Sequence, residues 1–340
     1  MIAIIILGYN NKHYLRDCFK NIQSSTYKKY QIVFVDNNST DGSIEYTRKY
    51  YPDIIVIKNA NNYGFAKGNN IGIKYALNKL KAKYVFILNP DTILDKNCLQ
   101  WLIKKADGQT ILQPLILLHQ NGKKTNLINT SGSVLHYLGF SYCGDYKKPT
   151  SIYKSVKEKE ITGASGAAIF VPEKIFRKIG LFDEIFFLYH EDIDLSWRAR
   201  LAGYSIKLIP AAKIWHKYSF SRNKKKLYFV ERNRLMFLIK NFQLKALLLI
   251  VPALIISEIL LLLYSFLTGW GVLKLKSYWQ ILINFGKILS SRKSTDRKLD
   301  DHLLKKYICP EIEFSEVKIA GLNFYNYISK VYWNIINKLM

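Results

Sequence analysis

The chain has few cysteines, and none of them are paired in a motif. Only four occur in 340 residues, at Cys18, Cys98, Cys143 and Cys309, and no two have C-x-x-C spacing. Such scattered cysteines do not suggest a cysteine-based metal site or redox centre. No cleavable signal sequence precedes the first strand-like run. We therefore expect a reducing, cytoplasmic location, with each cysteine acting as a small apolar residue of the fold.

Acidic residues are also scarce relative to basic ones. Asp and Glu total 25 against 51 Lys and Arg, a formal net charge of +26. Residues 217–310 hold 18 basic and 5 acidic residues, which is half of that excess. Nucleic acid and an anionic membrane surface both suit such a patch. Because the basic residues bracket a long apolar run, a membrane surface is favoured, and no nucleic acid is expected.

The length and the hydrophobic pattern favour an α/β domain. With 340 residues, 49% of them hydrophobic, the chain can bury a full core, and we expect one catalytic domain of roughly 200 to 250 residues with an appendage. Helix-like segments near 12–24, 41–51 and 66–80 separate strand-like runs at Ile2–Leu7, Gln31–Val35, Ile54–Ile57 and Tyr84–Leu88. These continuous apolar runs predict a parallel sheet covered on both faces.

Polar side chains follow each of the four strand-like runs. Parallel α/β sheets bind ligands at the carboxyl ends of their strands. The residues at those ends are Tyr9 and Asn10, Asp36 to Ser39, Asn59 to Asn62, and finally Asn89 and Asp91. We therefore expect a binding site along this edge of the sheet.

Asp36 is the first candidate at this edge. Its carboxylate can accept a hydrogen bond from a pyrimidine ring N–H or a ribose hydroxyl, with Gly8 and Tyr9 framing the base through the backbone. The alternative is a helix cap, because the D-N-N-S-T-D-G run is rich in capping residues. Nucleotide binding is favoured for Asp36 and capping for Asp41.

The segment Y-G-F-A-K-G-N-N-I-G suggests a phosphate-binding turn. Its glycines let the backbone approach a ligand, Lys67 offers a charge for phosphate, and the following helix is expected to start with exposed N–H groups. In the alternative interpretation the glycines are ordinary turn residues and Lys67 is solvated. We take Asn62, Lys67 and Asn70 as candidate ligand-binding residues.

Carboxylates are crowded among aromatic residues between Thr162 and His216. Burying acidic groups beside aromatic rings is unfavourable, so this F-D-E-x-F-F-x-Y-H-E-D-I-D-L-S-W-R segment points to an enzyme, with Asp192 as candidate catalytic base. Helical spacing places Glu191 and Asp194 one turn apart and Asp192 on another face. Asp194 is expected on the helix surface or paired with Arg198, and is not a catalytic candidate.

Four sequence blocks in order resemble glycosyltransferase family 2, close to its rhamnosyltransferase-like branch. They are G-Y-N-N with V-D-N-N-S-T-D-G-S, N-A-N-N-Y-G-F-A-K-G-N-N-I-G, I-L-N-P-D, and the F-D-E to W-R segment, across residues 1 to about 235. The resemblance implies an α/β, Rossmann-like GT-A domain that transfers a sugar from a nucleotide-diphosphate donor with inversion. Beyond about residue 245 it implies much less.

The resemblance also implies roles for particular residues. Asp192 would act as base, with Glu191 orienting it or the acceptor. The donor would contact Gly8, Tyr9, Asn10, Asp36, Asn38, Asn62, Lys67, Asn70, Asn89 and Asp91. The acceptor would lie against Gly163, Ala164, Ser165 and Trp197.

A divalent cation, Mg²⁺ or Mn²⁺, is the expected cofactor. Family members usually carry an acidic D-x-D after the fourth strand, whereas this chain has Asn89-Pro90-Asp91, with one carboxylate. Hard cations prefer oxygen ligands, so Asp91 and the donor diphosphate would share the ion. His216 resembles the family position that completes the coordination, although a single His in an apolar segment is also often structural.

The C-terminal third predicts membrane association. Leu244 to Trp270 is apolar and about long enough to cross a bilayer, yet it contains Pro252 and Glu258. Eight basic residues at 222–245 and seven at 274–298 leave the orientation undefined. An interfacial or hairpin-like anchor is therefore favoured over a single span, and Trp270 to Leu289 is expected as one in-plane amphipathic helix. The alternative is internal packing or homodimerisation.

The expected organisation is a catalytic domain over 1–235, a helical membrane-association segment over 236–290 and a tail of unassigned role over 291–340. A membrane-attached transferase implies a glycan acceptor on a lipid carrier at the cytoplasmic face, in polysaccharide synthesis, with dTDP-rhamnose or a UDP-sugar as donor. The rival interpretations are a catalytically silent scaffold of a glycan-assembly complex and a nucleic-acid-binding protein.

Overall fold

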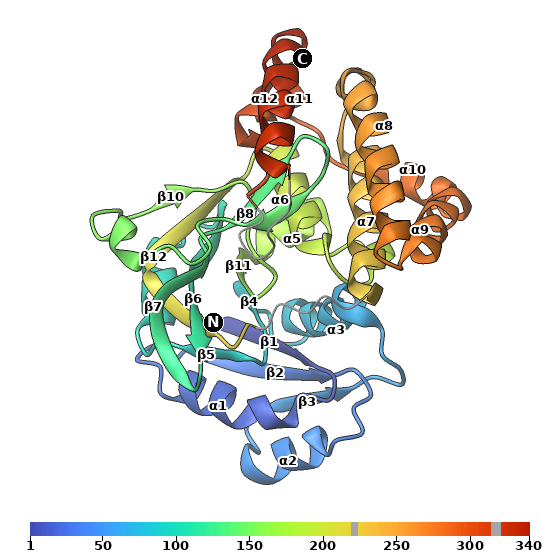
Figure 1. Cartoon of the computed structure of the whole chain (residues 1–340). Helices are drawn as coiled ribbons and strands as arrows, with labels where there is room; N and C mark the ends of the chain where they lie inside the picture. The colour runs from blue at the N-terminus through green and yellow to red at the C-terminus, as the bar shows by residue number, and fades with distance from the viewer. Residues whose placement is uncertain (219–223, 314–320) are drawn as a thin grey trace. The chain divides into compact units, whose positions relative to one another are not determined.

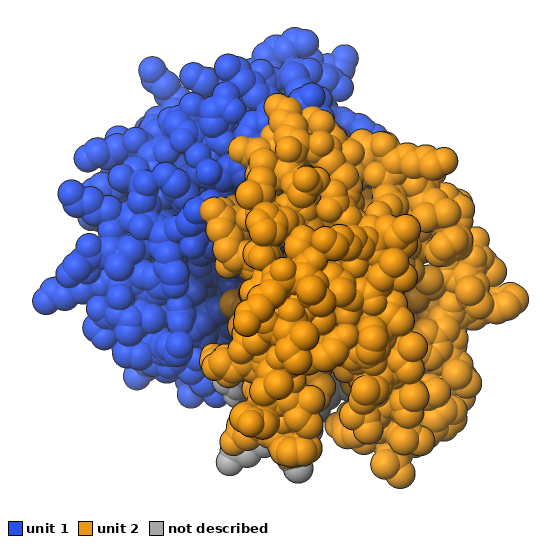
Figure 2. Space-filling model, turned by 90° about the horizontal axis from the view of Figure 1, so that it is seen from above, with its two compact units in different colours: residues 1–133, 143–199, 204–219 blue, residues 134–142, 200–203, 220–340 orange. Residues whose placement is uncertain are grey.

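The computed structural model describes residues 1–218, 224–313 and 321–340 (Figure 1). The chain divides into two compact units, coloured separately in Figure 2. The first comprises residues 1–133, 143–199 and 204–219, and the second comprises 134–142, 200–203 and 220–340. The functional boundaries expected at 235 and 290 stay a prediction.

The first unit is built on a ten-stranded mixed sheet. Its strand order is β10-β12-β6-β11-β4-β1-β2-β3, with β5 paired to β12 and β7 paired to β6. The parallel part consists of β1 (Ile2–Gly8), β2 (Tyr30–Asp36), β3 (Ile55–Lys58) and β4 (Tyr84–Leu88). These four strands confirm the runs expected from sequence, since apolar, β-branched residues fill both of their faces.

The remaining strands make the sheet mixed. Strand β11 (Ala168–Pro172) runs antiparallel to both β4 and β6 (Thr110–Gln120), and β12 (Ser205–His216) runs parallel to β6. The shorter members are β5 (Thr92–Leu94), β7 (Lys123–Thr130) and β10 (Lys159–Glu160). Antiparallel β11 brings the loop before it beside the end of β4.

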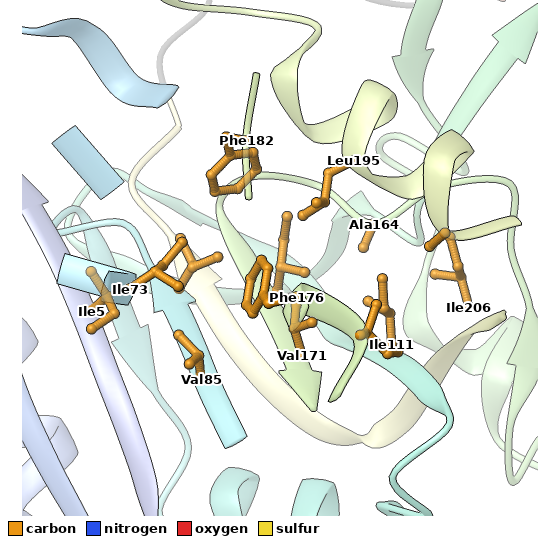
Figure 3. Close-up of a cluster of buried hydrophobic side chains, with 14 of the residues drawn as sticks. Ile5, Ile73, Val85, Ile111, Ala164, Val171, Phe176, Phe182, Leu195 and Ile206 are labelled. Carbon is orange, nitrogen blue, oxygen red and sulfur yellow. The ribbon is translucent and has the colours of Figure 1, made fainter. Parts of the chain in front are cut away.

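Helices cover the sheet through two separate apolar clusters. Leu15, Phe19 and Leu99 belong to one cluster, on α1 (Lys12–Gln23) and α4 (Cys98–Lys105). The other contains Ile73, Phe176 and Leu195, on α3 (Gly64–Asn78), α5 (Glu173–Ile179) and α6 (Glu191–Leu201), and is drawn in Figure 3. Helix α2 (Ser43–Tyr50) follows β2. With apolar side chains packed on both faces, the strand ends are left for polar residues.

The second unit is mainly helical. It contains α7 (Lys224–Asn241), α8 (Leu244–Leu267), α9 (Gly271–Ile283), α10 (Phe285–Lys293), the short α11 (Asp301–Leu304) and α12 (Leu322–Leu339). Strand β8 (Ser133–His136) joins β9 (Ser141–Cys143) and β13 (Ile308–Cys309) in a small sheet. The single amphipathic helix expected over 270–289 is wrong, because Asn284 separates α9 from α10.

Candidate active site

The sheet order places the predicted site residues in a row along one edge of the first unit. Strands β11, β4, β1, β2 and β3 are consecutive neighbours, so the segments at their site-side ends are adjacent. The backbone N–H of Asn89 donates to the Ala167 carbonyl (3.0 Å), Asn37 N–H to Gly8, and Asn59 N–H to Asp36. Residues far apart in sequence therefore line one continuous edge.

Asp36 lies at the carboxyl end of β2 and is fully buried. Its Oδ2 accepts a hydrogen bond from the Ser39 backbone N–H (2.9 Å), while its Oδ1 has no hydrogen-bond partner. A buried carboxylate oxygen without a partner is unfavourable unless a ligand supplies a donor. Asp41 instead accepts bonds from the backbone N–H groups of Lys12 and Ser43, the first residues of α1 and α2, while Gly42 is the N-cap residue of α2.

The loop after β1 is tied to the loop after β2. Asn10, at a positive φ of 55°, donates its N–H to Ser39 Oγ and accepts from the Thr40 N–H at Oδ1 (both 2.9 Å). Tyr9 stays 48% exposed beside it, as a flat ring available to a ligand. A side chain at Gly8 would meet the Phe34 ring at 2.7 Å, so the close packing there requires glycine. Asn38 is exposed.

The start of α3 differs from expectation. The backbone N–H groups of Phe65 and Ala66 donate to the Phe187 carbonyl (2.7 and 3.3 Å), and the Gly64 N–H donates to Asn62 Oδ1 (2.9 Å). The prediction that this helix begins with exposed N–H groups is therefore wrong. Lys67 remains exposed, with its ammonium group 4.2 Å from the centroid of the Tyr63 ring.

Asn70 is buried within the fold. Its amide donates to the Phe182 carbonyl (2.9 Å) and to Glu184 Oε1 (3.1 Å), and its Oδ1 accepts from the Phe182 N–H (3.1 Å). These bonds hold α3 to the segment before α6. They leave little capacity for a ligand, so its donor contact stays a prediction with no support from its surroundings.

Asp91 and His216 lie together, from the turn after β4 and the end of β12. Asp91 Oδ1 is 3.2 Å from His216 Nε2, although the geometry is not that of a hydrogen bond. His216 Nδ1 lies 2.8 Å from Oδ1 of Asn129, a buried residue of β7. Because the Asn129 oxygen only accepts, His216 carries a proton on Nδ1, and Nε2 is the nitrogen that faces Asp91.

This arrangement fits a shared divalent cation. A carboxylate oxygen and an imidazole nitrogen point at the same small space, where both are suitable ligands. Among the residues that the structure describes, no group of three or more His, Cys, Asp or Glu side chains could hold a metal. The protein therefore offers two ligands, and the donor diphosphate would have to supply others.

Asp192 lies at the start of α6 against the loop before β11. Its Oδ2 accepts a hydrogen bond from the Gly166 N–H and its Oδ1 from the Ile193 N–H, both at 2.8 Å. Burial raises the pKa of Asp192 in spite of these donors, which lower it. A carboxylate whose proton affinity is increased in this way is a better general base than an exposed Asp.

Glu191 is buried beside Asp192. Burial, followed by the neighbouring Asp192 charge, raises the pKa of Glu191 well above its ordinary value. Its Oε2 has no hydrogen-bond partner. Because two adjacent carboxylates are unfavourable when both are charged, Glu191 holds a proton more readily and leaves the negative charge on Asp192.

Asp194 forms an ion pair with Arg198. This pairing was one of the two alternatives that the helical spacing of Asp194 left open. Its Oδ2 accepts a hydrogen bond from Arg198 Nε (2.8 Å), and both side chains are buried. Arg198 also donates to the carbonyls of Ile179 (2.5 Å) and Leu181 (2.7 Å). This ion pair fixes α6 to the loop that leads into the acidic segment.

The small-residue loop 163–166 packs directly on α6. Ala164 N–H donates to Ser196 Oγ (3.0 Å), Ser165 N–H to Gln113 Oε1 (2.7 Å), and Gly166 N–H to Asp192. A Cβ at Gly163 would lie 2.5 Å from Ile193 Cδ1, so a larger residue there would require the Ile193 side chain to shift. Trp197 is completely buried, so it lies beneath this surface and is not placed to touch an acceptor.

The backbone just before α6 is unusual. Phe187, Tyr189 and His190 have positive φ angles of 59°, 69° and 67°. Residues with side chains adopt this conformation at an energetic cost, and such residues cluster at functional sites. Here the turn presents the Phe187 carbonyl to α3 and places Glu191 and Asp192 at the first turn of α6.

Sequence reasoning missed three residues that support this site: Asn129, Gln113 and Ser196. They orient His216, Ser165 and Ala164 respectively. Gln113 gave a signal, as a polar residue within the apolar strand β6, whereas Asn129 and Ser196 lie among other polar residues of β7 and α6. Only the fold shows what each one contacts.

The sheet order, the buried Asp36 and the Asp91–His216 pair fit a GT-A-type α/β domain, the fold of nucleotide-sugar transferases. A family model described as "Glycosyl transferase family 2" matches residues 3–180, and the chain belongs to this family. The expected membership of this family is therefore confirmed, and three of the four sequence blocks lie within the matched residues.

Three curated proteins similar to the chain have names that describe sugar transfer or glycan synthesis. It is 27% identical over 207 residues to the low-salt glycan biosynthesis hexosyltransferase Agl10 of Haloferax volcanii, covering 60% of this chain and 63% of that protein. It is 24% identical over 235 residues to the rhamnosyltransferase WbbL of Escherichia coli K12, covering 67% and 87%. The poly-β-1,6-N-acetyl-D-glucosamine synthase of Staphylococcus aureus is 26% identical over 216 residues, covering 63% and 49%.

The extent of these matches differs between relatives. The chain spans less than two thirds of the length of Agl10 and about half of the length of the S. aureus synthase. It spans most of the length of WbbL. The match to WbbL supports the likeness to the rhamnosyltransferase-like branch.

Solved structures show the same fold. The crystal structure of GalNAc-T7 with UDP, GalNAc and Mn²⁺ superposes with a TM-score of 0.57 at 16% identity, covering 71% of this chain and 48% of that one. The structure of S. aureus TarS 1–349 in complex with UDP-GlcNAc gives 0.50 at 15% identity, covering 99% and 90%. At such identities the likeness shows the fold, and the GT-A assignment is confirmed.

Proposed function

We propose that the protein is an inverting hexosyltransferase that moves one sugar from a nucleotide-diphosphate donor to a hydroxyl of a glycan acceptor. The observation that carries this proposal is the placement of Asp36 and Asp91 just at or after the ends of β2 and β4, with Asp192 of α6 bonded to the loop before the neighbouring strand β11. The likeness to WbbL favours dTDP-rhamnose as donor, with UDP-sugars as the alternative. Polysaccharide synthesis is the expected process.

In the proposed reaction Asp192 accepts the proton of the acceptor hydroxyl. The hydroxyl oxygen forms a bond to the anomeric carbon of the donor sugar, the bond from that carbon to the diphosphate oxygen breaks, and the nucleotide diphosphate leaves with the electron pair. One displacement inverts the anomeric configuration. The N–H groups of Gly166 and Ile193 hold the Asp192 carboxylate in place while each of its oxygens keeps a free lone pair.

The nucleotide-sugar donor would bind at the same edge of the sheet, through residues other than Asp192. The free Oδ1 of Asp36 would accept from the nucleoside, and the exposed Tyr9 ring would lie against it. Lys67 would meet a phosphate. Asp91 and His216 would hold Mg²⁺ or Mn²⁺, which would neutralise the charge that develops on the leaving diphosphate.

The acceptor is proposed to be carried on a lipid at the cytoplasmic face of the membrane. The support is α8, the one helix within the described parts of the chain that is long and apolar enough to cross a membrane; only 17% of its most apolar window is buried. Such a helix also occurs in soluble cores, but there it is mostly buried. Full activity on a water-soluble acceptor without membranes would contradict this part of the proposal.

Nucleotide binding should raise the thermal stability of the purified protein. We expect UDP or dTDP to raise the melting temperature more than GDP or CDP, and more with Mn²⁺ or Mg²⁺ than without. A ligand at a hundredfold excess over its Kd stabilises the native state by about 2.7 kcal/mol, which corresponds to several degrees for a chain of this size. Thermal unfolding with all four nucleotides checks this. No shift with any of them would favour a catalytically silent scaffold.

Asn129→Leu should weaken metal binding. Without the Asn129 oxygen, His216 loses the bond that keeps Nε2 directed at Asp91, and loss of such an orienting partner typically reduces metal affinity roughly 10–100-fold. Electron paramagnetic resonance of free Mn²⁺ in the presence of UDP measures this without relying on turnover.

Two further variants serve as controls for Asn129→Leu. Asn129→Asp keeps an acceptor for Nδ1 and should restore most of the affinity. Asn326→Leu removes an amide that makes two backbone bonds to Ile312 in the second unit and should leave Mn²⁺ binding unchanged. Equal Mn²⁺ affinity in wild type and Asn129→Leu would show that Asn129 does not position the ligand.

A further inference from the structure

Exposed apolar side chains are concentrated in the second unit. Of the 28 large hydrophobic residues that are well exposed in the described chain, 24 lie between Leu244 and Leu339. Most are on three helices: eleven on α8, five on α9 and six on α12. Soluble proteins rarely leave such contiguous apolar surface in water, so these helices are expected to contact something apolar.

Helix α12 carries a distinct apolar stripe. Its exposed residues recur every three or four positions, at Phe324, Tyr327, Ile328, Val331, Ile335 and Leu339. Ser329, Trp333 and Ile336 on the other side are buried. This is the pattern of an amphipathic helix with one face packed and one unpartnered. The sequence alone assigned no function to this segment.

The three helices are neighbours within the unit. Tyr332 of α12 donates from its hydroxyl to the Leu249 carbonyl of α8 (2.7 Å), and Tyr325 lies 3.4 Å from Ser257. On α9, Lys274 and Tyr278 donate to Glu258 of α8. The exposed stripes therefore belong to one connected helical layer.

A buried ion cluster explains how α8 tolerates Glu258 near its middle. Glu258 accepts hydrogen bonds from Arg234 of α7, from Lys274 (2.8 Å) and from Tyr278 (2.7 Å). Glu231 of α7 pairs with the same two cations, at 2.8 Å from Arg234 and 2.5 Å from Lys274. The two acids and two bases neutralise one another inside the unit.

This cluster argues against α8 crossing a bilayer. If Glu258 lay at the bilayer centre, α7 and α9 would have to lie there too. Helix α9 has 13 residues, or about 20 Å at 1.5 Å per residue, which is shorter than the roughly 30 Å of hydrocarbon. Helix α7 would carry Lys225, Arg232 and Lys240 into that region, which is energetically costly.

Charge decides which partner the layer fits. Residues 217–310, which include α8 and α9, hold 18 basic and 5 acidic residues, and a second copy of the chain would bring the same net positive charge. A leaflet with anionic headgroups has the opposite charge. Exposed aromatic residues, Trp279 (61%), Tyr264 (54%) and Tyr327 (68%), are of the type enriched at the membrane–water interface.

We propose that α8, α9 and α12 form one lipid-binding surface, with α8 lying in the plane of a single anionic leaflet instead of crossing the bilayer. The ion cluster lies on the protein side of α8, and the apolar stripes enter the leaflet. This lipid-binding surface would bring the enzyme to the lipid-linked acceptor, and in that sense it rests on the proposed function. The experiments below measure only membrane binding and the topology of α8.

The binding test uses full-length protein and sedimentation with vesicles of phosphatidylcholine, with or without phosphatidylglycerol. Wild type should bind, more tightly with phosphatidylglycerol. Ile328→Glu with Ile335→Glu on α12 should bind at least tenfold more weakly. The matched control, Tyr50→Glu with Ile152→Glu, places the same charge on exposed apolar sites of the first unit and should bind as wild type does. Circular dichroism confirms that both variants fold.

The topology test labels the two ends of α8 from outside sealed vesicles. Lys245→Cys and Thr268→Cys, both exposed, are placed singly in a background with Cys143→Ser and Cys309→Ser and treated with a membrane-impermeant maleimide. Labelling of both without detergent supports the in-plane helix. Protection of one end until detergent is added means that α8 crosses, and overturns the proposal.

The remaining outcomes separate this proposal from the enzyme function. Absence of vesicle binding by wild type, or equal loss in the control pair, overturns the lipid-binding surface even if sugar transfer is found. Vesicle binding with both ends labelled supports it even if no transfer to a lipid-linked acceptor occurs, in which case only the proposed function fails.

Discussion

Asp192→Asn should lower turnover by roughly 10²–10⁴-fold, because a positioned general base contributes about that factor. Asn has nearly the same shape and can still accept the Gly166 N–H bond, but it cannot take the acceptor proton. The Kd for the nucleotide should stay nearly unchanged, since the proposed function assigns that binding to Asp36 and Asp91 and not to Asp192. Steady-state kinetics with calorimetric titration of the nucleotide separate the two quantities, and near-normal turnover would remove Asp192 from the role of base.

The pH profile supplies an independent readout of the same residue. Because burial raises the pKa of Asp192, the fraction of ionised base, and with it the wild-type rate, should increase as pH rises through a range above that of an ordinary Asp. Asp192→Asn should lose this limb of the profile. A profile of the same shape in both proteins would assign the titration to another group.

Asp194→Asn is the matched control, two residues away in α6. Asp194 holds the buried Arg198, so its replacement should reduce thermal stability while leaving the chemical step intact at temperatures where the protein is folded. Asp192→Asn should do the opposite, because it removes a charge that burial disfavours. The two variants thus distinguish a catalytic carboxylate from a structural one in the same sequence segment.

Much of the fold could be predicted because its signals are local. The strands β1 to β4 are continuous β-branched and aromatic runs, and each is followed by polar residues that the sheet then brings to one edge. The carboxylate-rich segment before Trp197 was equally visible, because acids beside aromatic residues are rare in a core. For these features, the residue types and the length of each apolar run were sufficient to make the prediction.

The features that could not be predicted depend on contacts between distant segments. Asn129 reaches His216 only because β7 pairs with β6 and β6 with β12. The N–H groups at the start of α3 are occupied by the Phe187 carbonyl, from a turn far along the chain. The ionic partners of Glu258 come from α7 and α9, so its isolated position in an apolar run could not show that its charge is paired.

Arg234 is the central residue of the ion cluster that contains Glu258. It donates to both carboxylates of the cluster and to the Leu138 carbonyl (2.9 Å), and it lies over the Phe140 ring, 4.3 Å from the centroid. Burial alone would raise the pKa of Glu231, but the charges of Arg234 and Lys274 outweigh it and lower that pKa to about 2. Glu231 is therefore ionised in the folded protein and requires both cations.

Arg234→Met should accordingly destabilise the second unit by roughly 3–5 kcal/mol, because removing one partner leaves a buried charge uncompensated. Native-state hydrogen exchange of peptides from α7 to α9 measures this locally. Adding Glu231→Gln, which leaves Glu258 paired with Lys274 and restores neutrality, should recover a large part of the loss. If the single variant exchanged as slowly as wild type, Arg234 and its ion pairs would not be what holds these helices together.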